Sequence, residues 1–67
     1  MKSAKEVLRR TRFEAIQIVD NPDASIEGRK AWYYTHLGEI EFAWFMELIT
    51  EKEMRELEDE WKSHNPQ

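Results

Sequence analysis

The 67-residue sequence predicts an all-α protein of three helices, and three observations support this prediction. Apolar residues recur every three or four positions along most of the chain, which is the spacing of one face of a helix. Two capping boxes, Ser3 to Glu6 and Thr50 to Glu53, mark helix starts. Only two glycines and two prolines occur, and 40% of the residues are hydrophobic, which favours a folded helical chain over a disordered one.

The first predicted helix spans about residues 3–19. It begins at the Ser3 capping box, in which the serine hydroxyl can accept a hydrogen bond from the backbone N–H of Glu6. The run Asp20-Asn21-Pro22-Asp23 ends the helix, because the residue before proline is disfavoured in the α region and Asn and Asp favour turns. The apolar residues of this helix share one face: Ala4, Val7, Leu8, Ala15, Ile18 and Val19.

The second predicted helix spans about residues 25–48, with Ser25 as its cap and an earlier start at Pro22 as the alternative. A helix that is apolar on two faces is expected to lie between its neighbours, so we expect this long helix to be central. Its apolar residues form two roughly opposite stripes. The first stripe contains Ile26, Tyr33, Leu37, Ile40, Trp44 and Leu48, and the second contains Ala31, Gly38, Phe42, Phe45, Met46 and Ile49.

Gly38 stands in the middle of the second predicted helix. A glycine inside a helix costs about 1 kcal/mol relative to alanine. Two interpretations account for it: the helix breaks at Gly38, or another backbone passes close to it. We favour the close approach of another backbone.

The third predicted helix spans about residues 51–63 and starts at the Thr50 capping box. Met54, Leu57 and Trp61 give it a narrow apolar stripe, and Glu and Asp occupy most of the remaining positions. The chain leaves the helix before Asn65-Pro66, so we expect residues 64–67 to form a frayed tail. Residues 1–67 then form a single small helical domain.

Length and composition limit the class of protein. A chain of this length builds a core of marginal stability, and without cysteine it has neither a disulfide nor a thiolate zinc site to supplement that core. Oligomerisation is the remaining common supplement, so we expect the protein to be oligomeric. No apolar run approaches 18 residues, and the first residues lack the apolar segment of a signal peptide. These features predict no membrane association and a cytoplasmic location.

The sequence contains no pattern typical of an active site. His36 and Glu39 lie one helical turn apart and could serve a metal ion or a proton transfer, but the other histidine, His64, lies in the predicted tail. We therefore interpret His36 as a simple exposed histidine. We expect no enzymatic activity, no bound metal and no cofactor. Three of the hydroxyl side chains that could act as nucleophiles are already expected to cap helices: Ser3, Ser25 and Thr50.

Charge is distributed unevenly along the chain. Residues 1–30 carry seven basic and five acidic side chains, whereas residues 31–67 carry three basic and nine acidic ones. Lys5, Arg9 and Arg12 lie on one side of the first predicted helix and could bind the phosphates of a nucleic acid or nucleotide. The alternative is that they pair with the acidic third helix. A third hypothesis makes that acidic helix a decoy that imitates DNA phosphates and inhibits a host nucleic-acid enzyme.

Residues 31–45 contain six of the eight aromatic side chains. We expect the first stripe of the second helix to pack on the first helix and the second stripe to receive the third helix. The sequence favours a non-enzymatic interaction module that binds a protein partner, most simply a second copy of itself. Large apolar side chains beyond the predicted core are the interface candidates: Trp32, Tyr34, Phe42, Phe45, Phe13 and Ile16.

Residues 37–53, LGEIEFAWFMELITEKE, join an aromatic-rich helix to the helix start at Thr50. This run resembles a pattern found in small uncharacterised helical proteins of phages and other mobile elements in Gram-positive bacteria. The resemblance implies an accessory protein of a mobile element. It carries over no catalytic or binding residue.

Overall fold

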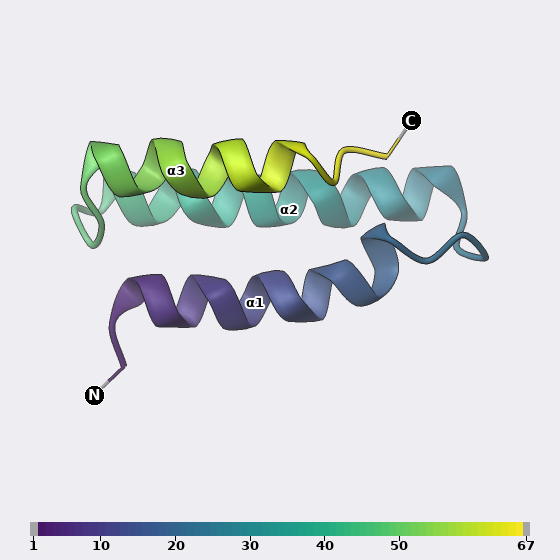
Figure 1. Ribbon diagram of the computed structural model, residues 1–67, viewed down its shortest axis with the longest axis horizontal. Coiled ribbons are helices and arrows are strands. Elements are labelled where there is room, and N and C mark those ends of the chain that lie inside the picture. Colours follow the sequence, from purple (N-terminus) through teal and green to yellow (C-terminus); the bar gives the residue numbers. More distant parts are fainter. Residues whose placement is uncertain (1, 67) are drawn as a thin grey trace.

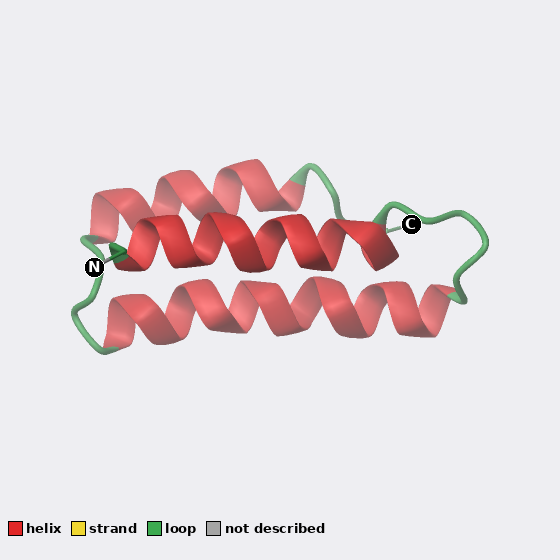
Figure 2. Cartoon of the chain, turned by 90° about the horizontal axis from the view of Figure 1, so that it is seen from below, coloured by secondary structure: helices red, strands yellow, loops and turns green. Residues whose placement is uncertain are grey.

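The computed structural model describes residues 2–66 and contains three α-helices, with no strand in that range. They are α1 (Ala4–Val19), α2 (Ile26–Phe45) and α3 (Glu51–Lys62). Consecutive helices run in opposite directions, and α2 packs against both α1 and α3 (Figure 1). Seen from below, the three helices lie side by side along their length and are joined by loops at the two ends (Figure 2). The predicted all-α fold of three helices is confirmed.

Each helix begins where its capping residue predicts. The Ser3 hydroxyl accepts a hydrogen bond from the backbone N–H of Glu6 at 3.2 Å. At Thr50 the capping box is complete: the hydroxyl accepts from the Glu53 N–H at 3.1 Å, and the Glu53 carboxylate accepts from the Thr50 N–H at 3.0 Å. Both bonds satisfy backbone donors that the first turn of a helix leaves without partners.

The connection between α1 and α2 uses the predicted stop signal. Ser25 caps α2 and accepts from the Gly28 N–H at 3.1 Å, so the alternative start at Pro22 does not occur. Asn21 instead closes a turn, because its side-chain oxygen accepts from the Asp23 N–H at 2.9 Å. Arg29 then reaches back from α2, and its Nε donates to the last carbonyl of α1, that of Val19, at 2.8 Å.

Helix α2 ends at Phe45, three residues before the predicted position. Glu47 adopts a left-handed conformation, with φ of 60°, which stops the helix. The Leu48 N–H then donates to the Ala43 carbonyl and the Glu47 N–H to the Trp44 carbonyl, both at 2.9 Å. This pair of bonds is the Schellman motif, which usually places glycine at the left-handed position. The apolar run 48–49 therefore belongs to the loop before α3.

The core lies between the three helices and on one side of α2. It contains the α2 residues Tyr33, Ile40 and Ala43, which share a helix face. Leu8, Ala15 and Val19 of α1, with Leu57 and Trp61 of α3, pack against this side, and Ile49 closes it from the loop. One compact core thus joins all three helices, as expected for a single small unit.

Two details of the predicted packing are wrong. Trp44, assigned to the core stripe, is 42% exposed, and Leu48 lies exposed in the loop. Phe42, Phe45 and Met46 do not receive α3 and are also exposed. The reason is that α1 and α3 both pack on the Tyr33 side of α2, so the opposite side has no neighbouring element among residues 2–66.

The segment after α3 is not frayed where the structure describes it. His64 Nδ1 lies 3.2 Å from a carboxylate oxygen of Asp20, at the end of α1, and the His64 ring packs 5.3 Å from the ring of Trp61. Pro66 is buried. These contacts hold residues 64–66 against the body of the molecule, whereas Gln67 lies outside the described residues.

Within the single chain, neither of the two interpretations proposed for Gly38 applies. Helix α2 continues through this residue without a break, and a Cβ atom placed on Gly38 would meet no atom within 4 Å beyond its immediate helical surroundings. Gly38 is exposed. Within the single chain, neither a turn nor a close contact requires glycine at this position.

Replacing Gly38 with alanine should therefore stabilise the single chain. We expect Gly38→Ala to raise the free energy of unfolding by about 1 kcal/mol, because alanine restricts the unfolded backbone and favours the helix. Urea unfolding at low protein concentration measures this change. Gly28→Ala is the matched control: its Cβ would lie 3.1 Å from the capping Ser25 hydroxyl, so it should give a smaller gain or a loss. Equal gains at both positions would contradict the explanation.

The left-handed Glu47 predicts a second stabilising change. A left-handed conformation costs an L-residue about 1 to 2 kcal/mol, and glycine avoids this cost at the expense of a more flexible unfolded chain. We expect Glu47→Gly to raise the free energy of unfolding by about 0.5 to 1 kcal/mol. Glu47→Ala, which keeps a Cβ, should show no such gain in the same urea titration. Stabilisation by alanine equal to that by glycine would point to the charge of Glu47 instead.

Candidate functional site

The side of α2 opposite the core carries a continuous exposed stripe. Five residues form this stripe at spacings of three or four positions: Ala31, Tyr34, Gly38, Phe42 and Phe45. Viewed down the helix axis, each lies within about 40° of their common mean direction. We call these five residues the outer face of α2. The outer face points away from both α1 and α3, because those helices pack on the Tyr33 side.

The outer face exposes three large aromatic rings. Tyr34 is 59% exposed, Phe42 63% and Phe45 76%. Gly38 is exposed between Tyr34 and Phe42, and Ala31 is exposed one turn before Tyr34. A contiguous apolar surface of this kind, rather than a single exposed ring, is typical of a protein interaction site.

The other predicted interface residues are placed differently. Trp32 is half exposed and flanks the outer face. Phe13 is 68% exposed but lies on the side of α1 turned away from α2, as its helical spacing from Ala15 requires. Ile16 packs against the core cluster and is only partly exposed, so it does not belong with the surface candidates.

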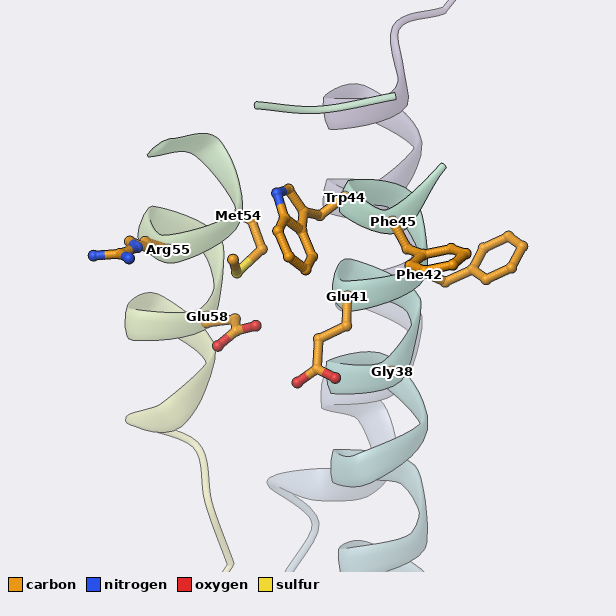
Figure 3. Close-up of a pocket in the computed structure, with 8 residues that line it drawn as sticks. All are labelled: Gly38, Glu41, Phe42, Trp44, Phe45, Met54, Arg55 and Glu58. Atoms are coloured by element: carbon orange, nitrogen blue, oxygen red, sulfur yellow. The ribbon is translucent and has the colours of Figure 1, made fainter. Parts of the chain in front are cut away.

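A groove of about 630 Å³ adjoins the outer face between α2 and α3. Trp44 and Met54 point toward each other across it, and the carboxylates of Glu41 and Glu58 lie below them on opposite walls (Figure 3). Phe42 and Phe45 project from the other side of α2, away from α3 (Figure 3). The exposed apolar surface therefore continues from the outer face around to Trp44 and Met54.

His36 is buried, which corrects its interpretation as an exposed histidine. Only 2% of it is exposed, and its ring packs edge-on against Trp61 with ring centres 4.6 Å apart. Its Nδ1 lies 3.1 Å from a Glu39 carboxylate oxygen and 3.4 Å from the Thr11 hydroxyl. Its Nδ1 atom is thus occupied within the fold. No group of three or more metal-binding side chains occurs within residues 2–66.

Burial lowers the pKa of the His36 imidazole below its ordinary value of 6.5, because the charged form would lose its hydration. The hydrogen bond from Nδ1 to Glu39 and the negative charge of that carboxylate oppose the shift, and the positive charge of Arg12 adds to it. The net lowering shows that burial outweighs the carboxylate. His36 is therefore held mainly as the neutral imidazole in the folded chain.

Two of the three basic residues predicted on one side of α1 interact with α3, as the alternative hypothesis of pairing with the acidic helix expected. Arg12 forms an ion pair with Glu60 of α3 at 2.7 Å. Lys5 lies near enough to Glu53 for its charge to help lower the pKa of that carboxyl, behind the larger effect of the Thr50 backbone N–H. Arg9 is exposed and forms no ion pair among the described residues. The three cations thus do not form one unpaired cluster.

Sequence reasoning missed the buried position of His36, although a signal was present. His36 lies three residues after Tyr33 and four before Ile40, which places it on the same helix face as these two core residues. A polar residue on an apolar face is buried only when it has hydrogen-bond partners, and here Glu39 supplies one from the next turn.

No helix within residues 2–66 has the length and apolar character needed to cross a membrane. Comparison of the chain with protein-family models, with curated proteins and with solved structures found no match.

The lowered pKa of His36 predicts a loss of stability in mild acid. The unfolded chain takes up a proton near pH 6.5, whereas the folded chain resists it, so protons favour unfolding as the pH falls below that value. The free energy of unfolding should therefore decrease between about pH 7 and 5.5. His36→Gln should flatten this decrease in urea titrations at several pH values, whereas His64→Gln should retain it. An unchanged slope in His36→Gln would contradict the assignment.

Proposed function

We propose that this protein is a non-enzymatic interaction module that self-associates through the outer face of α2. The observation that carries the proposal is the exposure of Tyr34, Phe42 and Phe45 on one stripe of the central helix. Water contact with these rings is unfavourable, and burying one such ring contributes on the order of 1.5 to 3 kcal/mol. Aromatic residues are also enriched among those that dominate binding energy at protein interfaces.

The small size of the chain supports the same proposal. A domain of 67 residues buries only about 60% of the surface that its unfolded chain exposes, so its own core supplies little stability. Here part of that limited apolar content lies outside the core, on the outer face. Association would bury it and add to the stability of the folded chain.

The side chains that could perform chemistry support a binding role over catalysis. His36 is buried and bonded to Glu39 and Thr11, and the hydroxyls of Ser3, Ser25 and Thr50 cap helices. A surface that binds a second copy needs no catalytic side chain. A symmetric dimer is also the commonest assembly of soluble proteins. An accessory role in a mobile element rests on the resemblance of residues 37–53 alone.

A charge on the outer face should abolish self-association. We expect the unaltered protein to sediment as a dimer or larger species at micromolar concentration and Phe45→Glu to sediment as a monomer. Glutamate would bury an unpaired charge where a ring had packed, at a cost of about 2 kcal/mol or more in binding free energy. Analytical ultracentrifugation over a concentration series measures the change.

Phe13→Glu is the matched control for this experiment. Phe13 is as exposed as the rings of the outer face but lies on the far side of α1, so the same charge there should leave the assembly intact. A monomeric unaltered protein would contradict the proposal. Dissociation by Phe13→Glu with none by Phe45→Glu would place the interface elsewhere.

A further inference from the structure

We propose that the outer face of α2 binds the same face of a second copy in antiparallel orientation, with the two-fold axis passing beside Gly38. This inference rests on the proposed function and names the partner and its geometry. Three features of the chain lead to it: the spacing of the outer face, the open surroundings of Gly38, and the placement of charge along its edge.

The outer face is symmetric in spacing about Gly38. Tyr34 and Phe42 lie four residues before and after it, and Ala31 and Phe45 lie seven residues before and after it. A two-fold axis at Gly38 therefore brings Tyr34 beside the partner's Phe42 and sets the small Ala31 opposite the partner's Phe45. Each exposed ring then meets a ring or a small residue, which is the complementarity that a self-binding surface requires.

Gly38 has a role in this arrangement that it lacks in the single chain. Packed helices lie about 8 to 10 Å apart, and the residues at the crossing point face each other directly. Side chains of the two Gly38 positions would meet at the axis, so the absence of a Cβ allows the rings on either side to interdigitate. The space around Gly38 is open in the described chain, as a contact surface must be before its partner binds.

Charge along one edge selects the antiparallel orientation. Lys30 and Glu41 lie on the same edge of the outer face, eight residues before and three after Gly38, and neither forms an ion pair within residues 2–66. The proposed axis places Lys30 about 8 Å along the helix from the partner's Glu41, a separation that the two long side chains can span. A parallel two-fold pair would instead place the two copies of this edge on opposite sides of the interface, so Lys30 would not meet the partner's Glu41.

The size of the surface fits a stable dimer. The stripe from Ala31 to Phe45 is about 21 Å long, and Trp32 and Trp44, both partly exposed, flank it on its two sides. A standard interface covers about 800 Å² on each partner, which is about one sixth of the 4915 Å² surface of this chain. One side of the molecule can provide that share.

Engineered cysteines test the geometry, since the chain has none of its own. Ala31→Cys mixed with Phe45→Cys under mild oxidation should give a mixed disulfide dimer as the main covalent product, because the proposed axis sets these positions directly opposite. Each variant alone should crosslink poorly, since identical positions would lie about 21 Å apart along the helix. Mass spectrometry distinguishes the products, and Phe13→Cys should crosslink with neither.

The results separate this inference from the proposed function. Disulfide dimers of Ala31→Cys alone and of Phe45→Cys alone would indicate a parallel pair and overturn the inference, while self-association through the outer face would stand. A dimer by sedimentation that forms no mixed disulfide would overturn it in the same way. An unaltered protein that sediments only as a monomer would overturn both. Circular dichroism checks that each variant remains helical, as expected for exposed positions.

Gly38→Ala gives a second test that does not depend on crosslinking. The added methyl groups would meet at the axis, so we expect the dimer dissociation constant to rise at least about tenfold. The same substitution should stabilise the single chain, so a general loss of folding cannot produce this result. A dissociation constant equal to that of the unaltered protein would overturn the placement of the axis.

Discussion

The packing of Trp61 against α2 decides how the rest of the molecule is arranged. Trp61 is fully buried, and its indole N–H donates to the Tyr33 carbonyl at 2.8 Å. Its ring stacks on the Tyr33 ring, with centres 5.6 Å apart and planes 11° from parallel, and meets His36 edge-on. The apolar stripe of α3 is narrow, and Trp61 with its buried neighbour Leu57 holds the helix on the Tyr33 side of α2. The His64 ring also packs against the indole, with ring centres 5.3 Å apart, and so holds the segment after α3.

Because α3 is held on the Tyr33 side, α2 has two neighbours on one side and none on the other. The apolar residues of α2 nevertheless occupy two opposite faces of the helix, and a helix of that kind normally lies between neighbours on both faces. Residues 2–66 contain no fourth helix that covers the remaining side. The outer face is therefore exposed because α1 and α3 both pack on the Tyr33 side, and the proposed partner would cover it.

Local signals in the sequence were sufficient to locate the helices, because Ser3, Ser25 and Thr50 each bond the backbone of the turn that follows. The end of α2 was not predictable, since a left-handed glutamate at 47 carries no sequence signal. Periodicity also left open which stripe of α2 would be covered, because both are rich in aromatic residues. Tertiary contacts of Trp61 resolved that choice, and they bury His36 as well. The sequence identifies Tyr34, Phe42 and Phe45 only as large apolar side chains beyond those that the predicted core needs, without showing that they share one exposed face.

Gly38 and the exposed rings raise the same thermodynamic question. In the single chain both are unfavourable: glycine weakens the helix, and the rings remain in contact with water. A helix pair crossing at Gly38 accounts for both at once, because the missing Cβ admits the partner that covers the rings. Only the folded chain presents this face, so association would stabilise the fold by mass action. In the proposed dimer, folding and assembly would be coupled through α2, and a second copy would supplement the marginal core of a small domain in place of a disulfide or a metal ion.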